Sequence, residues 1–255
     1  MEVFFVQILC QVMLVFDIHC HILPCVDDGS GSLIDSVEMA ELAIRSGTVG
    51  IIATPHCNMP GAFENFWSAD FDAKIKELNG ALLNRNIPIM VYPGQEIFAY
   101  GDIVERIKNN ELITLNNSKY ILVEFDFSVS EREMLKYLRM IMAEGYVPIV
   151  AHPERYFLFG EAPETVRDIR SVGALVQVNS SSITGNFGYY PERVASYFLE
   201  NQLADFVASD AHSQYSRTPD LFSVHEMICE NYSYEYADLL LDGNPLNVIN
   251  NKEIR

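Results

Sequence analysis

The sequence predicts a mixed α/β fold, and within that class a (β/α)7 barrel. Short apolar runs alternate with helix-like stretches along the chain, and histidines and carboxylates recur where the runs end. Strands that alternate with helices pair in parallel and are buried on both faces. A barrel gathers the C-terminal ends of all strands into one mouth. An open doubly wound sheet is the alternative, but no glycine-rich phosphate loop follows any run.

Seven apolar runs bounded by Gly, Pro or polar residues are the predicted strands. Runs such as GIIAT, PIVA and DFVA are nearly continuously apolar, which is typical of strands covered on both faces. The seven ranges are Val15–His19, Gly50–Thr54, Ile87–Tyr92, Tyr120–Phe125, Val147–Ala151, Ala174–Val178 and Asp205–Ala208.

Helices are predicted between these strands and at the end of the chain. Ser130 and Glu133 have the spacing of a capping box, and Gly47, Gly145 and Gly173 stand where helices should end. The predicted helices are Leu33–Ser46, Asp70–Asn86, Ile103–Asn109, Glu131–Glu144, Pro163–Ser171, Pro191–Asn201, Asp220–Asn231 and Tyr234–Leu241.

Composition narrows the class of protein. The 255 residues are 49% hydrophobic, and no linker or low-complexity tract divides them, so we expect one domain over residues 1–255. The net charge of −18 disfavours nucleic acid and anionic membranes as partners unless bound cations reverse the local field. The five cysteines form no C-x-x-C pair, and their odd number disfavours a disulfide framework. A reducing cytoplasm is therefore the expected location.

The start of the chain is unusually apolar from Val3 to Phe16. This run lacks a preceding basic residue and a cleavage site, and it is shorter than the about 20 residues that span a membrane. We interpret residues 1–14 as a packed first segment, or as the result of a start codon assigned too far upstream. Membrane association is the alternative.

Histidines and carboxylates at the strand ends are the candidate site. Residues two apart on a strand face the same way, so His19 and His21 should point into one space, as should Asp210 and His212. These two pairs come from the first and last strands and would face each other across the closing seam. The nine ligand-type side chains are His19, His21, Asp28, His56, Glu96, Glu124, His152, Asp210 and His212.

This set predicts a cluster of two or three metal ions. Any one of these residues could be a hydrogen-bonded core residue, and Glu124 could simply pair with a base. Burying all nine without cations would be costly, however, and imidazoles with carboxylates suit Zn, Fe or Mn. Several close cations favour hydrolysis of an anionic ester by a metal-bound hydroxide. His225 falls within a predicted helix, and we interpret it as structural.

Two arginines near the strand ends are candidate phosphate ligands. Arg155 follows His152 by three residues and Arg217 follows His212 by five, so both could lie over the mouth. The alternative is that they are ordinary surface arginines paired with Glu154 or Asp220.

Seven motifs resemble, in order and spacing, those of the PHP (polymerase and histidinol phosphatase) superfamily: DIHCHILPCVDDGS, IIATPH, GQEI, VEF, AHPERY, VNSSS and SDAH. Within it, the chain most resembles the bacterial capsule/exopolysaccharide-type, manganese-dependent protein-tyrosine phosphatases. The similarity runs from about Val15 to the final DGNPLNVI. It implies a distorted (β/α)7 barrel of PHP type holding three ions, most readily Mn²⁺, with Fe or Zn as alternatives.

Transferred onto this sequence, the resemblance implies metal ligation by all nine side chains and phosphate contact by Arg155 and Arg217. Asp210 counts both as a ligand and as a catalytic residue. The implied substrate is the phosphotyrosine tail of a cognate bacterial tyrosine kinase, so membrane contact would be indirect, through the kinase. No thiol nucleophile is expected, because neither Cys20 nor Cys57 begins a Cys-x5-Arg loop.

Two departures and three rival functions stay open. Cys25 stands where the family usually has Gly before V-D-D-G, which predicts strain that could displace Asp28, and residues 1–14 lie outside the similarity. One rival is a PHP phosphoesterase for a small ester such as histidinol phosphate. The others are a catalytically silent relative that binds kinase or glycan machinery, and an amidohydrolase of the deaminase type.

Overall fold

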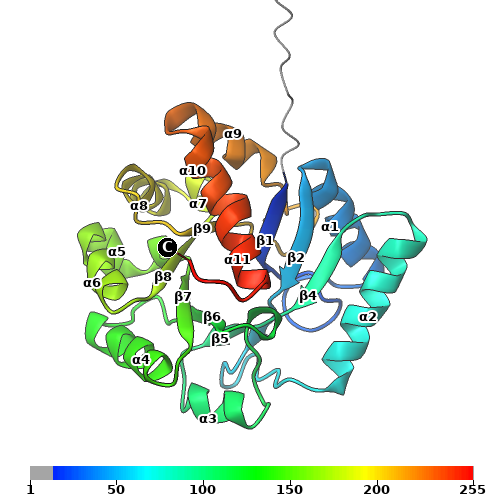
Figure 1. The fold of residues 1–255 in the computed structure, drawn as a ribbon, viewed down its shortest axis with the longest axis horizontal. Helices are drawn as coiled ribbons and strands as arrows, with labels where there is room; N and C mark the ends of the chain where they lie inside the picture. Colours follow the sequence, from blue (N-terminus) through cyan, green and yellow to red (C-terminus); the bar gives the residue numbers. More distant parts are fainter. Residues whose placement is uncertain (1–13, 255) are drawn as a thin grey trace, which may run out of the picture.

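The computed structural model describes residues 14–254 and places the strands in a ring with helices around it (Figure 1). This confirms the predicted distorted (β/α)7 arrangement. The strands are β1 (Val15–Cys20), β2 (Thr48–Ala53), β3 (His56–Cys57), β4 (Met90–Pro93), β5 (Glu96–Phe98), β6 (Tyr120–Glu124), β7 (Val147–Ala151), β8 (Leu175–Asn179) and β9 (Phe206–Ala208).

The longer helices surround the ring, and several short helical segments lie among the loops. The α-helices are α1 (Leu33–Arg45), α2 (Ala69–Asn84), α3 (Ile103–Lys108), α4 (Glu131–Ala143), α5 (Phe157–Glu161), α6 (Val166–Ser171), α7 (Ser180–Ile183), α8 (Tyr189–Glu200), α9 (Phe222–Asn231), α10 (Tyr234–Asp238) and α11 (Asn244–Ile249). The remaining helical turns are η1 (Leu115–Asn117), η2 (Pro153–Arg155), η3 (Pro163–Thr165) and the π-turn η4 (Leu239–Gly243).

Two parallel sheets make up the ring, in the orders β1-β2-β4 and β3-β5-β6-β7-β8-β9. All seven predicted strands are present, and β3 and β5 follow β2 and β4 after short breaks. One break contains Pro55, which has no N–H to donate. The other contains Gly94, where a Cβ would lie 2.6 Å from Ile52 Cγ2. Beyond the breaks, His56 and Glu96 are register partners on adjacent strands.

The first and last strands meet at the C-terminal end of the ring. The Asp210 N–H donates to the His19 carbonyl at 2.8 Å, and the His21 N–H donates to the Ala211 carbonyl at 2.9 Å. Cys20 and Ala211 form the isolated parallel bridge of this seam. The His19 and His21 pair of the first strand therefore faces Asp210 beyond the last strand, as predicted.

The interior of the ring is filled with apolar side chains, among them Ile18, Ile52, Leu122 and Phe206. Val248 of α11 packs into the same cluster and is fully buried. The segment after α11 also accepts a hydrogen bond from the Tyr120 hydroxyl, at the start of β6. Since α11 covers the N-terminal end of the strands, the functional space is left at their C-terminal ends.

The predicted helix boundaries are close to the observed ones. The Glu133 N–H donates to Ser130 Oγ at 3.3 Å, and Gly47, Gly145 and Gly173 adopt φ of 85°, 86° and 94° at helix ends. The predicted helix over 163–171 divides into η3 and α6, and that over 234–241 into α10 and part of η4. The helices α5, α7 and α11, of five, four and six residues, were not predicted.

Cys25 has a left-handed backbone with φ of 54°, as its glycine-like position predicts. Its thiol donates to the Gly31 carbonyl at 2.9 Å. This strain does not displace Asp28 from the cluster, because Asp28 Oδ1 lies 3.5 Å from His212 Nε2.

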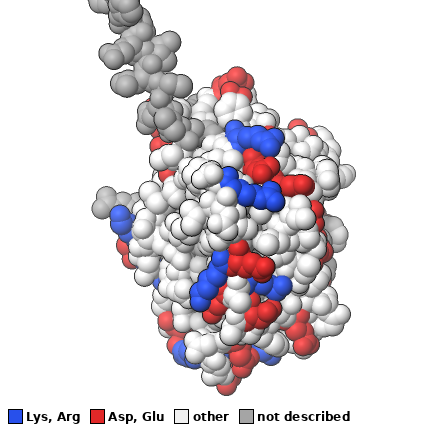
Figure 2. Space-filling view, turned by 90° about the vertical axis from the view of Figure 1, so that its right-hand side faces the viewer, with Lys and Arg blue, Asp and Glu red and all other residues white. Residues whose placement is uncertain are grey.

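The predictions for the apolar leader fall largely on residues 1–13, outside the described residues. Within residues 14–254, no helix combines the length and the apolar character that crossing a bilayer requires. The face turned to the viewer in Figure 2 shows acidic and basic side chains side by side. The acidic excess therefore does not form a continuous patch on that face.

Candidate metal centre

The structure brings all nine predicted side chains together at the mouth of the ring. His19 belongs to β1, His56 to β3, Glu96 to β5 and Glu124 to β6, and the others stand just beyond a strand. His21 and Asp28 follow β1, His152 follows β7, and Asp210 and His212 follow β9. The mouth thus collects ligand-type side chains from both sheets.

Glu96 lies at the centre of the cluster and is fully buried. Its Oε2 lies 3.3 Å from His19 Nε2, 3.4 Å from His21 Nε2 and 2.8 Å from His56 Nδ1. Its Oε1 lies 2.9 Å from His152 Nε2. One carboxylate that faces four imidazoles is placed to bridge neighbouring cations.

The nine side chains fall into four overlapping groups whose potential ligand atoms lie within 4.8 Å of one another. The groups are His21, Asp28, His56 and His212; His19, Glu96 and His152; His19, His21 and Asp210; and His56, Glu96 and Glu124. Four residues, His19, His21, His56 and Glu96, each belong to two groups, so the groups form one continuous cluster.

Unpaired buried atoms show that this donor set fits divalent cations. Glu96 Oε2, Glu124 Oε2, Asp210 Oδ1, His56 Nδ1 and His212 Nε2 are all buried without a hydrogen-bond partner. A polar atom left in this state is costly, and carboxylate oxygens with imidazole nitrogens are the ligands that Mn, Fe and Zn accept.

The surroundings of the two most buried carboxylates of the cluster favour their ionised form. Burial disfavours the charged form of Glu96, but His19 and His56 stabilise it and hold its pKa well below the usual value. Burial likewise opposes ionisation of Asp210, and His19 and Arg217 hold the pKa of that carboxyl well below its usual value. Both side chains can therefore act as anionic ligands.

A second layer of hydrogen bonds orients the candidate ligands. Asp27 Oδ2 lies 2.7 Å from His21 Nδ1, and Gln177 Oε1 lies 2.9 Å from His19 Nδ1. The Asn179 amide donates to Asp210 Oδ2 at 2.6 Å. Partners of this kind fix ring orientation and tautomer at metal sites.

These three orienting residues were not predicted from the sequence. Gln177 and Asn179 lie two apart on β8, an otherwise apolar strand, and a polar pair with that spacing on one face was the available signal. Asp27 adjoins Asp28 in the V-D-D-G stretch, and spacing alone could not separate a ligand from its partner.

Both predicted arginines reach Asp210. Arg155 Nη1 lies 3.5 Å from Asp210 Oδ2, and Arg217 Nη2 forms an ion pair with the same oxygen. The Phe187 ring lies 4.6 Å from Arg155 Cζ and 5.7 Å from Arg217 Cζ. Phe127 covers the guanidinium of Arg155 at 4.9 Å. The arginines are thus held by aromatic faces that leave their in-plane N–H groups available.

The alternative pairing of these arginines with Glu154 or Asp220 is wrong. Glu154 Oε1 instead accepts hydrogen bonds from the Asn179 N–H at 2.9 Å and the Ser182 hydroxyl at 2.7 Å. Asp220 accepts from the Phe222 N–H and the Ser223 hydroxyl at the start of α9.

Three residues of the site have left-handed backbones although none is glycine. The φ angles are 33° for His152, 50° for Asp210 and 50° for Arg217. Such conformations are uncommon for residues with a Cβ and persist where the surrounding structure enforces them.

Cys20, Cys57 and His225 belong to none of the four groups. Cys20 and Cys57 are fully buried, burial raises the pKa of both thiols, and their sulfur atoms face backbone carbonyls. His225 lies on α9 outside the four groups, with a ring nitrogen 3.6 Å from Cys229 Sγ.

Known proteins share this arrangement. Residues 15–250 match the family described as "Capsular polysaccharide synthesis, CpsB/CapC". The chain is 41% identical to the tyrosine-protein phosphatase YwqE of Bacillus subtilis over 201 residues, which cover 79% of this chain and 78% of the relative. It is 32% identical to the tyrosine-protein phosphatase CpsB of Streptococcus agalactiae over 251 residues, covering 93% and 99%.

Solved structures agree with the sequence comparisons. A structure from work on YwqE and Streptococcus pneumoniae CpsB, described as metal-dependent tyrosine phosphatases, matches with a TM-score of 0.88 and 36% identity over 94% of this chain and 96% of that one. A histidinol phosphate phosphatase from Lactococcus lactis matches with a TM-score of 0.55 and 15% identity, which shows a shared fold alone. The motifs, the barrel and these matches together place the chain in the CpsB/CapC family, as the resemblance to PHP-type phosphatases predicted.

Proposed function

We propose that this protein is a metal-dependent protein-tyrosine phosphatase. The observation that carries the proposal is a cluster of nine histidine and carboxylate side chains at one mouth, with two arginine side chains directed at its Asp210. The tyrosine-phosphatase names of relatives that are 32–41% identical support the same activity.

The nine clustered side chains are the proposed metal ligands, for three ions with Mn²⁺ as the preferred metal and Fe or Zn as alternatives. The four overlapping groups, with Glu96 shared between two of them, support more than one ion. Bound divalent cations supply an activated water and stabilise charge on the attacking and leaving oxygens of a phosphoryl group.

Asp210 connects the ligand cluster to the arginines. Its Oδ1 faces His19 and His21 at 3.4 Å, whereas Oδ2 faces Arg155 and Arg217. In the proposed mechanism the two guanidinium groups bind the non-bridging phosphoryl oxygens with their free N–H donors. The departing tyrosine oxygen has a pKa of about 10, so only weak assistance is needed for it to leave.

The proposed substrate is the phosphotyrosine tail of a bacterial tyrosine kinase in capsule or exopolysaccharide export. Membership of a capsular polysaccharide synthesis family supports this partner. We further propose that the whole chain forms one phosphatase domain, that it acts in the cytoplasm, and that it meets the membrane only through the kinase.

Metal dependence and substrate class can be tested together. The purified protein is treated with chelator, reloaded with Mn²⁺, Fe²⁺ or Zn²⁺, and assayed on a phosphotyrosine peptide and on histidinol phosphate. Chelation should abolish turnover, Mn²⁺ should restore it best, and the peptide should be the better substrate. Full activity without metal, or faster turnover of histidinol phosphate, would contradict the proposal.

Substitutions separate the roles of individual residues. Arg155→Ala should lower kcat/KM for the peptide about 100-fold or more, because it removes a charged donor from the phosphoryl group. Arg139→Ala, at an exposed position on α4, is the matched control and should have little effect. Cys20→Ser should retain turnover, and its loss at full metal content would argue for thiol chemistry instead.

A further inference from the structure

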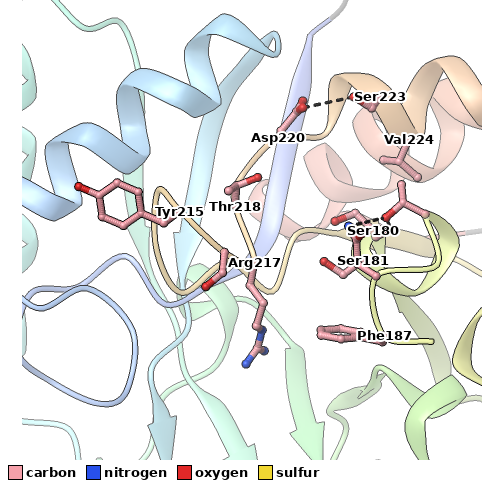
Figure 3. Close-up of a pocket in the computed structure, with 12 residues that line it drawn as sticks. Ser180, Ser181, Phe187, Tyr215, Arg217, Thr218, Asp220, Ser223 and Val224 are labelled. Atoms are coloured by element: carbon pink, nitrogen blue, oxygen red, sulfur yellow. Dashed lines mark hydrogen bonds between the residues drawn. The ribbon is translucent and has the colours of Figure 1, made fainter.

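A cavity of about 490 Å³ opens beside Arg217, one of the two proposed phosphate-binding arginines (Figure 3). One wall is the loop over residues 215–220, another is formed by α7 and the segment that follows it, and the start of α9 closes the far end. The lining residues used below are Ser180, Ser181, Phe187, Arg217, Thr218 and Asp220.

Arg217 and Phe187 separate this cavity from the metal centre and belong to both. In Figure 3 the Arg217 side chain extends from its loop past Phe187 toward the strand ends. Its guanidinium pairs with Asp210, while the rest of the side chain lines the cavity. A phosphoryl group bound by the arginines would therefore have its peptide at the entrance of the cavity.

The walls offer hydroxyl groups that the protein itself does not use. Among the hydrogen bonds of residues 14–254, none involves the side-chain hydroxyl of Ser180, Ser181 or Thr218, and the bond drawn at Ser180 in Figure 3 is accepted by its backbone carbonyl from the Thr184 hydroxyl. Ser180 and Ser181 are only 5% and 7% exposed, so they are fixed in the wall. A hydroxyl both donates and accepts, which suits peptide groups and uncharged polar side chains.

The charge of the cavity disfavours an acidic occupant. Asp220 contributes a carboxylate to the lining, and the protein has a net charge of −18. Arg217 is the cation of this lining, and it is already directed toward Asp210 and the phosphoryl position.

We propose that this cavity is a substrate subsite that binds the residues flanking the phosphotyrosine and favours uncharged polar side chains. The inference rests on the proposed phosphatase function and deepens it, because it adds contacts that a phosphotyrosine peptide makes and a free phosphate ester lacks.

The test compares kcat/KM for a phosphotyrosine peptide with Ser and Asn flanks against kcat/KM for free phosphotyrosine, using the Mn²⁺-loaded full chain. Thr218→Leu, which fills the cavity and removes a hydroxyl, should lower the peptide-to-amino-acid ratio about tenfold. Thr165→Leu is the matched control, since Thr165 is also half-buried but lies between α5 and α6, and it should change the ratio less than twofold.

Ser181→Ala provides a second variant that removes a hydroxyl without adding volume, and it should lower the ratio about threefold. Replacing the peptide flanks by Glu should also lower kcat/KM for the unaltered enzyme, more than replacing them by Gln. The subsite is refuted if peptide and free phosphotyrosine are turned over equally well, or if Thr218→Leu lowers both equally. Failure to hydrolyse either compound would instead overturn the phosphatase function itself.

Discussion

Cys25 occupies a backbone conformation that glycine adopts at much lower cost. Its φ of 54° is left-handed, and this backbone conformation costs a residue with a Cβ roughly 1–2 kcal/mol. Cys25→Gly should therefore raise the free energy of unfolding by about 1 kcal/mol, after allowing for the greater entropy of the unfolded glycine chain. Urea denaturation measures the change. Cys25→Ala keeps the Cβ and is the control, and an equal gain in that variant would show that the thiol, not the backbone, is responsible.

His225 should make stability depend on pH. Burial lowers the pKa of His225 below its usual 6.5, although the negative charges of Asp238 and Glu226 partly raise it. Cys229 and Tyr234 also pack beside the His225 ring. The unfolded chain therefore binds this proton more readily, so the stabilising effect is present above pH 6.5 and is lost as the pH falls.

Comparing the stability of the unaltered protein with that of the His225→Gln variant isolates this effect. Between pH 7.5 and 5, the stability of the unaltered protein should fall relative to that of the variant, as measured by urea denaturation at each pH. A difference that stays constant over this range would show that His225 has the same pKa in both states.

At the residue scale, the ligand-type side chains were predictable because residue type and strand position already restrict their chemistry. His56 and Glu96 could be placed at strand ends without knowing how those strands pair. Asp27, Gln177 and Asn179 were not predictable, because an orienting role depends on a hydrogen bond of 2.6–2.9 Å that only the folded chain shows.

The short helix α11 contributes to stability by filling the N-terminal end of the ring. Val248 packs against the interior cluster and is fully buried from solvent. Val248→Ala should lower the free energy of unfolding by about 2 kcal/mol through lost burial and the cavity left behind. Leu246→Ala is the control on the same helix, since Leu246 is 37% exposed. Equal losses in a thermal or urea melt would mean that α11 does not seal the interior.

At the element scale, the strands and longer helices could be predicted from apolar patterning, and the shortest elements could not. β3 and β5 contain two and three residues, too few for any alternation to appear. Their existence follows from the breaks at Pro55 and Gly94, whose effect depends on the neighbouring strand.

Metal binding should stabilise the entire molecule. Four carboxylates and five imidazoles converge from both sheets, so cations would join segments distant in sequence. At a free Mn²⁺ concentration 100 times the Kd, binding to the native state adds about 2.7 kcal/mol. Scanning calorimetry should show a higher Tm with Mn²⁺ than with chelator, and Glu96→Gln should reduce the shift. Glu230→Gln, at an exposed position on α9, is the control, and an equal reduction in both variants would argue against the cluster.

At the scale of the whole molecule, alternation of strands and helices was enough to predict a ring of parallel strands. It could not predict how the ring is divided into two sheets or joined at Cys20 and Ala211. The division follows from the local breaks at Pro55 and Gly94, whereas the bridge at the seam joins residues 191 apart in the sequence, for which local patterning carries no information.

The left-handed backbones of His152, Asp210 and Arg217 have a consequence for heat resistance. Each is held in place by its neighbours at a cost of order 1–3 kcal/mol, so modest warming can relax the mouth while the helices stay intact. The phosphatase activity should therefore decrease reversibly at temperatures below the Tm of the circular dichroism signal. The difference between these two temperatures would measure how strongly the surrounding structure holds the residues of the site in place.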